Sequence, residues 1–279
     1  MSPPVTSVSR NALPASLTLV GAGKMGGALL RGWLDGGLNP AATTVIDPQV
    51  GPDLAALCAE RGVALNPTKS SVAKTLVVAI KPQGLEAAAP SLAPLVGPDT
   101  LVLSILAGKT LANLAERFPG THAFVRTMPN LPASIGRGAT GAVASAAVTP
   151  AQHATADALL ACSGLVEWVE DEKLIDAVTA VSGSGPAYAF LLAEALAEAG
   201  TRAGLPTEMA ARLARATVAG AGALLEASPV EAGQLRRDVT SPGGTTAAAL
   251  AVLMREGGLP DLLTEAVEAA RRRAGELAG

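Results

Sequence analysis

This sequence has few aromatic residues and no large excess of charge of either sign, and each of these shortages excludes a class of partner. Phe, Trp and Tyr make up only 2% of the 279 residues, too few for a surface that stacks nucleic-acid bases. The formal net charge of −3 creates no basic field to recruit nucleic acid or anionic lipid. We therefore expect no nucleic-acid partner and no membrane partner.

Histidine, cysteine and lysine, which often transfer protons or bind metals, are absent from most of the second half of the chain. No cysteine follows Cys162, no histidine follows His153 and no lysine follows Lys173. Metal sites need clustered His or Cys, whereas alcohol dehydrogenases and nucleophile triads need a base, usually His or Lys. We therefore expect no metal, and a substrate that arrives already protonated, as in the reduction of a protonated C=N bond.

The two cysteines and the first residues of the sequence indicate the cellular compartment in which we expect the protein. Cys58 and Cys162 lie far apart in apolar helical patterns, so we expect buried free thiols, which are typical of a reducing compartment. Residues 1–15, interpreted as a flexible segment, lack the apolar core of a secretion signal, and no uninterrupted apolar run reaches membrane-spanning length. These patterns favour a cytoplasmic protein.

Short β-branched runs alternate with Ala- and Leu-rich helical runs in the first part of the chain. The predicted strands are Leu17–Val20, Thr43–Asp47, Leu76–Ile80, Thr100–Ile105 and Ala123–Thr127, with further edge strands at Val143–Ala146 and Leu165–Val169. The predicted helices include Lys24–Asp35, Asp53–Arg61, Thr110–Phe118 and one that begins at Pro150. This alternation is typical of an α/β fold with a mostly parallel, doubly wound sheet.

A glycine-rich turn follows the first predicted strand and opens a helix. Gly21, Gly23 and Gly26 have the spacing of a dinucleotide-binding loop. The first glycine permits the tight turn, the second lets the pyrophosphate approach the backbone, and the third lets the helix pack on the strand. We therefore interpret residues 16–172 as a Rossmann-type, dinucleotide-binding domain.

Further candidate residues lie at the carboxyl ends of predicted strands, where this architecture binds its ligands. Asp47 ends the second strand, where a carboxylate accepts hydrogen bonds from adenosine ribose and repels a 2′-phosphate, which favours NAD; alternatively, it only caps the turn before Pro48. Lys81 follows the third strand, and either contacts cofactor phosphate or ribose or is a solvated loop lysine. Residues 104–108 end the next strand.

From Lys173 onward only helices are predicted, and several are apolar on nearly every side. Residues 211–225 carry only Arg212, Arg215 and Thr217 as clearly polar residues, and such a helix needs neighbours on most sides. We therefore expect residues 173–279 to form an all-α dimerisation domain covered by a second copy of the chain, rather than a compact monomeric bundle. The predicted helices are Leu174–Val181, Pro186–Ala203, Thr207–Ala227, Ser228–Arg237 (which opens on a capping box, Ser228-Pro229-Val230-Glu231), Thr245–Arg255 and Pro260–Ala278.

The segment Val239–Thr246 precedes a run of Ala and Leu, and we interpret it as the mouth of a helix. Its proline, two glycines and hydroxyl residues leave several backbone N–H groups unpaired and open. Free donors and the positive end of the helix dipole suit a small anion such as a carboxylate. The chain therefore combines a dinucleotide site with a site for a small carboxylate substrate.

These motifs occur in order with others, over nearly the whole chain beyond residue 15. The set consists of Gly21–Gly26, Lys81–Gln83, Arg126–Pro132, Asp176–Tyr188 and Val239–Thr246. It closely resembles the pyrroline-5-carboxylate reductase family, which completes proline biosynthesis. The resemblance implies a Rossmann domain followed by a helical domain that forms an interlocked dimer, active sites between the cofactor domain and the dimer interface, and larger assemblies such as decamers.

The resemblance also implies the reaction and its residues. NADPH or NADH would deliver hydride to C5 of 1-pyrroline-5-carboxylate, as the iminium, to give L-proline. Thr246 would be the catalytic residue, with its hydroxyl against the ring nitrogen, and Gly244 and Thr245 the main amide donors to the carboxylate. The implied substrate-binding residues are Ser241, Gly243, Gly244, Thr245, Thr246 and Ser184, although Ser184 also fits a plain break between two helices. The implied cofactor-binding residues are Gly21, Ala22, Gly23, Lys24, Met25, Asp47, Ala79, Ile80, Lys81, Pro82, Ile105, Leu106, Ala107 and Asp238.

Departures from the family pattern leave the cofactor preference open, and two other classes of protein remain as alternatives. Asp47 stands where members that prefer NADPH present small polar or basic residues, so both NAD and NADP stay open. Lys69 would reach a 2′-phosphate or is a solvated loop lysine, and Lys24 would add positive charge near the pyrophosphate. A β-hydroxyacid dehydrogenase-like enzyme, or another imine reductase, shares the domain plan, but the former is expected to carry a lysine in the helical half. A nucleotide-sensing dimer without activity would have no use for the mouth at residues 243–246.

Overall fold

The computed structural model describes residues 13–278, and their contacts divide them into two compact units. Residues 13–183 with 271–278 form one, here called the sheet unit, and residues 184–270 form the other, here called the helical unit. Of the flexible segment expected at 1–15, residues 1–12 lie outside the described residues. The domain boundary expected between residues 172 and 173 stays a prediction, because a division by contacts does not test where a functional domain begins.

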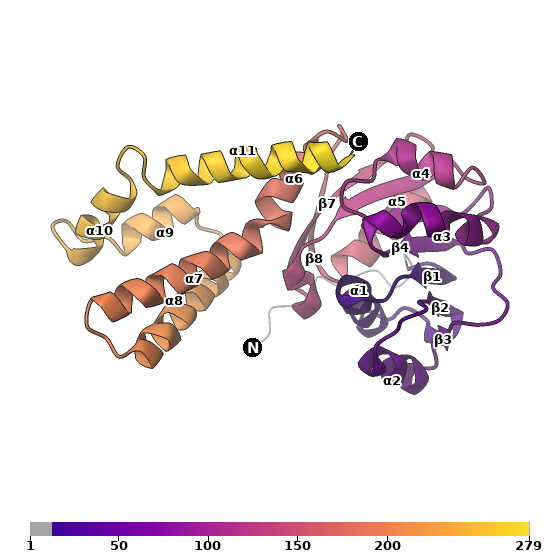
Figure 1. Cartoon of the computed structure of the whole chain (residues 1–279), viewed down its shortest axis with the longest axis horizontal. Helices are drawn as coiled ribbons and strands as arrows, with labels where there is room; N and C mark the ends of the chain where they lie inside the picture. The colour runs from indigo at the N-terminus through magenta and orange to yellow at the C-terminus, as the bar shows by residue number, and fades with distance from the viewer. Residues whose placement is uncertain (1–12, 279) are drawn as a thin grey trace. The chain divides into compact units, whose positions relative to one another are not determined.

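Within the described residues, eight strands form one sheet in the order β3-β2-β1-β4-β5-β6-β7-β8 (Figure 1). The strands are β1 (Leu17–Val20), β2 (Thr43–Ile46), β3 (Ala64–Leu65), β4 (Thr75–Val78), β5 (Leu101–Ser104), β6 (Phe124–Met128), β7 (Gly138–Ala144) and β8 (Gly164–Trp168). Neighbouring strands are parallel except β6 and β7, which are antiparallel. The mostly parallel sheet expected from the sequence is therefore confirmed.

The two ends of the sheet differ from the expectation. β7 lies between β6 and β8, so that only one of the two expected edge strands is at an edge. β3 is the other edge, and it pairs with β2 through only two residues. A strand of that length is too short to give a recognisable alternation of apolar and polar residues, which is why the sequence did not reveal it.

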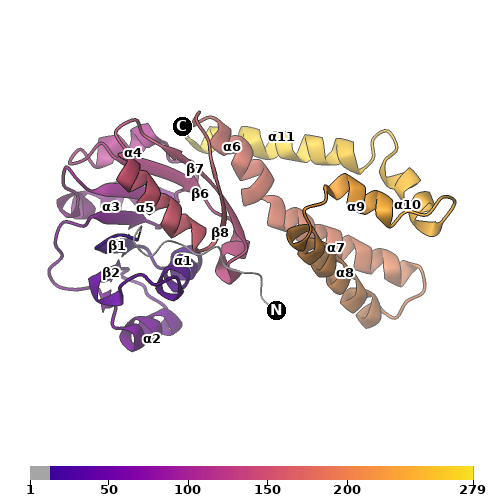
Figure 2. The ribbon, with the colours of Figure 1, turned by 180° about the vertical axis from the view of Figure 1, so that it is seen from behind.

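Helices cover both faces of the sheet (Figures 1 and 2). They are α1 (Lys24–Asp35), α2 (Pro52–Arg61), α3 (Leu85–Leu92), α4 (Leu111–Arg117) and α5 (Pro150–Ala161). Successive side chains of a strand point to opposite faces, and in β4 Val77 packs in one core with α1, α2 and α5. Leu76 and Val78 pack in a second core with α3 and α4. The doubly wound arrangement is therefore confirmed.

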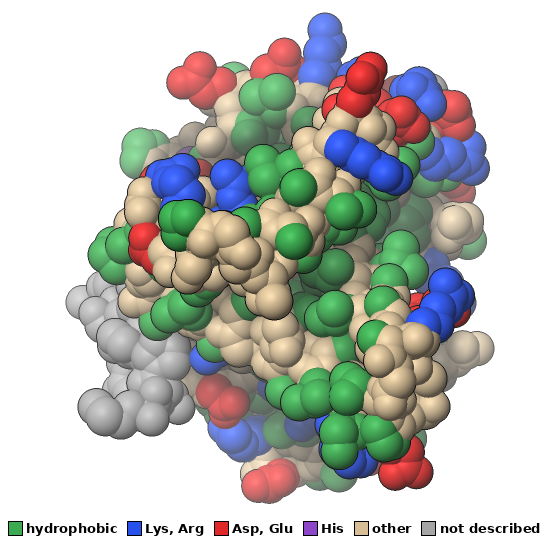
Figure 3. All heavy atoms as spheres, turned by 90° about the vertical axis from the view of Figure 1, so that its left-hand side faces the viewer, with side chains coloured by type: hydrophobic (Ala, Val, Ile, Leu, Met, Phe, Trp, Pro, Cys, Tyr) green, Lys and Arg blue, Asp and Glu red, His purple; other side chains and the backbone are tan. Residues whose placement is uncertain are grey.

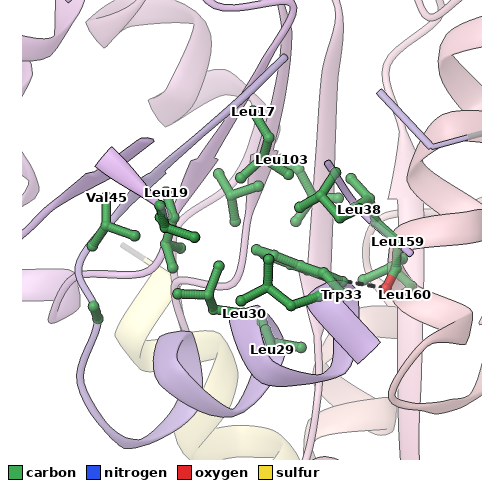
Figure 4. Close-up of a cluster of buried hydrophobic side chains, with 14 of the residues drawn as sticks. Leu17, Leu19, Leu29, Leu30, Trp33, Leu38, Val45, Leu103, Leu159 and Leu160 are labelled. Atoms are coloured by element: carbon green, nitrogen blue, oxygen red, sulfur yellow. Dashed lines mark hydrogen bonds between the residues drawn. The ribbon is translucent and has the colours of Figure 1, made fainter. Parts of the chain in front are cut away.

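Trp33 joins α1 to α5 in the core of the sheet unit. Its side chain is fully buried, and its indole N–H donates to the carbonyl oxygen of Leu159 at 2.8 Å (Figure 4). A buried indole needs such an acceptor, because an unsatisfied polar group in the core is destabilising. Replacing a buried Trp by Ala typically costs about 3–5 kcal/mol, so this contact stabilises the half of the sheet that carries the glycine-rich turn.

The remaining elements are helical. They are α6 (Leu174–Val178), a π-helical turn at Thr179–Gly183, α7 (Gly185–Arg202), α8 (Thr207–Ala227), α9 (Ala232–Asp238), α10 (Thr245–Leu253) and α11 (Leu259–Ala278). α6 and the π-helical turn belong to the sheet unit, as do the last residues of α11. The predicted all-α second part is therefore confirmed. No helix in the described part of the chain is both long and apolar enough to cross a bilayer.

Several helix boundaries differ from the predictions. α9 begins at Ala232 rather than at Ser228, and the expected capping box is wrong, since Glu231 stands at the N-cap without a side-chain cap. The Ser228 hydroxyl accepts from the Val230 N–H at 3.2 Å, but residues 229–231 are not helical, so Ser228 does not cap a helix. The sequence did not predict α3, which contains Pro90, a residue that disfavours helix interiors.

The two cysteines are free, as expected. Cys58 is buried and Cys162 is half-buried. Burial raises the pKa of the Cys58 thiol and raises that of Cys162 to about 11, because a low-dielectric environment disfavours the thiolate. Both thiols therefore behave as packing groups rather than as nucleophiles.

Candidate active site

The glycine-rich turn after β1 is packed so closely that two of its glycines admit no side chain. Gly21 has a φ of +87°, and a methyl group there would lie 2.7 Å from the backbone of Ala79 and Ile80. A methyl group on Gly26 would collide with the carbonyl oxygen of Gly21. A methyl group on Gly23, by contrast, would have no other atom within 4 Å. The turn is therefore crowded at Gly21 and Gly26 but open at Gly23, and a backbone that contacts a pyrophosphate needs such an open position.

Asp47 is fixed against this turn. One carboxylate oxygen accepts from the Ala22 N–H at 2.7 Å, and the other accepts from the Gln49 N–H at 2.7 Å. Asn66 holds the Asp47 backbone by two hydrogen bonds: its side-chain oxygen accepts from the Asp47 N–H at 2.9 Å, and its side-chain NH₂ donates to the Asp47 carbonyl oxygen at 2.7 Å. Asp47 therefore caps the turn before Pro48 and also presents its carboxylate to the glycine-rich turn.

The loops after β4 and β5 join the glycine-rich turn at the same edge of the sheet. The Ala79 N–H donates to the carbonyl oxygen of Val20 at 2.7 Å, and the Ile105 N–H donates to that of Val78 at 3.1 Å. The structure thereby brings together the predicted cofactor residues of the sheet unit: Gly21–Met25, Asp47, Ala79–Pro82 and Ile105–Ala107. Lys24 and Lys81 are exposed. Leu106 is only 1% exposed, so this residue offers almost no surface to a ligand.

Two of the sequence motifs meet inside the sheet unit. In the motif Arg126–Pro132, the Asn130 amide donates to the carbonyl oxygen of Ser182 at 3.0 Å, and its oxygen accepts from the Ala139 N–H at 2.9 Å. Ser182 lies in the π-helical turn, a feature that often marks functional sites. Asn130 thus connects this motif with the segment that leads to Ser184, which is half-buried and is the N-cap of α7.

The mouth of α10 lies in the helical unit. Gly244 is the N-cap of this helix and provides no side chain, so the first turn has no side-chain cap. The Gly244 N–H donates to the carbonyl oxygen of Ser241 at 3.0 Å, and this bond closes a turn with Gly243 at a φ of +70°. Because the Gly244 amide is already engaged, the donors best placed for an anion are the amides of Thr245 and Thr246. The Thr246 side chain is half-buried, whereas Ser241 and Thr245 are exposed.

The remaining predicted residues lie on the surface, and some residues that shape the site were not predicted. Asp238, at the end of α9, is exposed, and its carboxylate accepts from the Gln234 amide at 2.6 Å. Lys69 is an exposed loop residue. Asn66 and Glu172 take part in the contacts of the strand-end loops but were not predicted. Asn66 has a positive φ of 47°, whereas the contacts of Glu172 with Leu111 and Arg126 join segments far apart in the sequence. Among residues 13–278, no three His, Cys, Asp or Glu side chains gather as a metal site.

Family models match both parts of the chain. Residues 172–277 match the model described as pyrroline-5-carboxylate reductase dimerisation. Residues 16–108 match the model described as NADP oxidoreductase, coenzyme F420-dependent.

Relatives of known name match over nearly the full length. The chain is 40% identical over 264 residues to a pyrroline-5-carboxylate reductase of Pseudomonas aeruginosa, covering 94% of this chain and 96% of that protein. It resembles the structure of such a reductase from Coxiella burnetii with a TM-score of 0.86 and 34% identity, over 95% and 98% of the two chains. The Plasmodium falciparum enzyme, solved with NADP bound, gives a TM-score of 0.79 at 25% identity, over 96% and 100%.

Proposed function

The chain belongs to the pyrroline-5-carboxylate reductase family, and on that premise we propose that it reduces 1-pyrroline-5-carboxylate to L-proline with NAD(P)H, the last step of proline biosynthesis. The observation that carries this conclusion is 40% identity to a named reductase over 94% of the chain. The fold agrees, since a structure of the same name superposes with a TM-score of 0.86. Relatives of this name over almost the whole length favour neither a β-hydroxyacid dehydrogenase nor a nucleotide sensor.

The sheet unit binds the cofactor through the strand-end residues described above. Gly21–Met25 take the pyrophosphate, where the Gly23 position is open, while Ala79–Pro82 and Ile105–Ala107 contact the cofactor through the loops after β4 and β5. Asp47 lies at the end of β2 and accepts hydrogen bonds from the adenosine ribose. A carboxylate there repels a 2′-phosphate, so NADH is the preferred form and NADPH the weaker one.

The mouth of α10 binds the substrate carboxylate. Uncapped amides of the first turn donate to it, and the helix dipole adds roughly 0.3–2 kcal/mol. Thr245 and Thr246 supply these donors, with Ser241, Gly243 and Gly244 forming the turn and Ser184 the floor of the site. Asp238 approaches the cofactor from the helical side.

Hydride transfer is accelerated mainly because the site holds cofactor and substrate in the right relative position. Hydride leaves C4 of the nicotinamide and forms a C–H bond at C5 of the protonated imine, while the C=N π electrons become the lone pair of the neutral amine. The Thr246 hydroxyl hydrogen-bonds to the ring nitrogen, and solvent supplies or removes the remaining proton. Fixing two reactants in the right geometry can lower the barrier by roughly 7–11 kcal/mol at best. No dedicated catalytic acid is therefore required.

The helical unit forms a homodimer. Large apolar side chains on α7 are exposed, with Phe190 at 59% and Leu191 at 62%, and apolar groups are interspersed over the face of the molecule in Figure 3. In this unit, the described hydrophobic residues below 9% exposure are only Ala210 and Ala214. A unit with so little core of its own needs a partner, and residues 172–277 match a dimerisation model. Free thiols support a cytoplasmic location.

Steady-state kinetics with the full chain test this function. Pyrroline-5-carboxylate should oxidise NADH and NADPH, and the product should be L-proline in stoichiometric amount. A panel of 3-hydroxy acids with NAD⁺ serves as the comparison. Turnover of a hydroxy acid without turnover of the cyclic imine would overturn the proposal, and cofactor binding with no turnover of either would point to a sensor instead.

A further inference from the structure

The loop after β5, here residues 105–110, is held in place by a segment far away in the sequence. Gly108 has a φ of +73°, and a methyl group there would lie 2.6 Å from the carbonyl oxygen of Leu277 and 3.1 Å from its Cβ. The backbone of the last turn of α11 therefore lies directly against this loop. No side chain fits at Gly108, both because of the left-handed backbone and because of this contact.

A second contact holds the far end of the same loop. The Leu111 N–H, at the start of α4, donates to a carboxylate oxygen of Glu172 at 2.8 Å. The same oxygen accepts from the Arg126 guanidinium at 2.9 Å. The Arg126 side chain is only 5% exposed, and charge-assisted hydrogen bonds are stronger away from water. Glu172 thus anchors the start of α4 to the buried Arg126 side chain in the middle of β6.

Both contacts belong to one cluster within the sheet unit. Arg126 also lies 3.6 Å from a carboxylate oxygen of Asp176. A methyl group on Gly275 would come within 3.5 Å of the other oxygen of Asp176, and the neighbouring Ala274 is 8% exposed. The last turn of α11 therefore contacts both the loop and the ion-pair cluster that holds the end of the loop.

The loop needs this support in its second half. Leu106, at 1% exposure, anchors the first half in the core, but none of residues 107–110 is buried. A loop that samples other conformations lowers the fraction of molecules competent to bind a ligand. The apparent dissociation constant then rises by the inverse of that fraction.

We propose that the last turn of α11 (residues 274–277) and the Arg126–Glu172 pair are positioning elements of the cofactor site, which hold residues 107–110 in the conformation that binds NAD(P)H. The inference rests on the proposed function, because that function assigns Ile105–Ala107 to the cofactor. These positioning residues act through the loop, so their loss changes cofactor affinity rather than the chemical step.

The experiment compares two glycines with the same backbone strain. Gly62 has a φ of +76° and nothing within 4 Å of a methyl group, so Gly62→Ala introduces only the strain, whereas Gly108→Ala adds the collision with Leu277. A third variant ends after Ala274 and removes the contact without straining the loop. For each protein, NADH and NADPH affinity is measured by cofactor fluorescence, and KM for both cofactors, KM for pyrroline-5-carboxylate and Tm are determined.

Gly108→Ala and the shortened chain should both weaken NAD(P)H binding about tenfold, as expected if the competent fraction falls to about one tenth. KM for pyrroline-5-carboxylate should change less than about twofold, and Gly62→Ala should bind cofactor like the wild type. Equal cofactor affinity of Gly108→Ala and Gly62→Ala, or unchanged affinity in the shortened chain, would overturn the inference. Failure of the wild type to reduce the imine would instead overturn the proposed function.

Discussion

The carboxylate of Asp47 accepts a hydrogen bond from the backbone N–H of Ala22 at 2.7 Å, which ties the end of β2 to the glycine-rich turn. Asn66 fixes the Asp47 backbone from the other side through two further hydrogen bonds. The negative charge is therefore held in place before any cofactor binds. An acidic group that cannot swing aside is well suited to discriminate between cofactors that differ by one phosphate.

Asp47→Asn should shift the cofactor preference toward NADPH. Two like charges about 4 Å apart near a protein surface repel by about 4 kcal/mol, and relief of ~1.4 kcal/mol is enough for a tenfold change. We expect the ratio of kcat/KM for NADPH to that for NADH to rise about tenfold or more. Asp99→Asn, an exposed aspartate before β5, is the matched control. An unchanged ratio would remove Asp47 from cofactor selection.

Thr246→Ala should lower kcat while leaving cofactor binding intact. Loss of a hydrogen bond to a charged group costs about 1.5–3 kcal/mol, so turnover should fall about 10- to 100-fold. Thr246→Ser keeps the hydroxyl and should retain most of the activity. Measurements of kcat and of NADH affinity for the three proteins decide the matter. Equal turnover of the Ala variant and the wild type contradicts a role for this hydroxyl.

Gly244→Asp should abolish substrate binding while the protein stays folded. The backbone at Gly244 (φ −79°, ψ 173°) is allowed for any residue, and Asp is a favoured N-cap. A Cβ there would lie 3.1 Å from the Ser241 carbonyl oxygen, so the turn must shift slightly and Tm should change little. The new carboxylate would occupy the anion site and repel the substrate carboxylate. Gly244→Asn has the same size without the charge, and should lose less affinity. Saturation of Gly244→Asp at the wild-type substrate concentration would refute the proposed carboxylate site.

Phe190→Glu should break the dimer. Phe190 is 59% exposed on α7, and in a two-fold symmetric interface each substitution acts twice. Light scattering coupled to size-exclusion chromatography should give the mass of one chain for this variant and a multiple of it for the wild type. Val72→Glu, which changes a similarly exposed residue (56%) of the sheet unit, should keep the wild-type mass. If both variants keep it, α7 is not part of the interface.

Local patterns predicted the elements whose determinants lie within one segment. β1 at Leu17–Val20 and α1 at Lys24–Asp35 have the predicted bounds, because a buried strand and an amphipathic helix each leave a pattern in consecutive residues. The glycine-rich turn could be predicted equally well, since a φ of +87° at Gly21 favours glycine over every other residue type. α3 was missed because Pro90 interrupts its pattern.

Contacts between distant segments could not be predicted in this way. Glu172 and Leu111 are 61 residues apart, and nothing in either segment indicates the other. The capping box at Ser228 is a related case, because the residue types fit the motif, whereas residues 229–231 are not helical and α9 begins only at Ala232. For the candidate site, residue identities followed from motifs, but the hydrogen bond that occupies the Gly244 amide emerged only from the fold.

The hydrogen bond from Trp33 to Leu159 joins residues 126 positions apart, and this separation affects how the chain folds while it is being synthesised. While a ribosome makes the chain, α1 emerges long before α5, so the Trp33 indole N–H lacks its acceptor and one side of the surrounding core is still missing. Contacts of high sequence separation slow folding, and transiently exposed apolar surface invites aggregation. The core around α1 is therefore complete only after residues near 160 have left the exit tunnel.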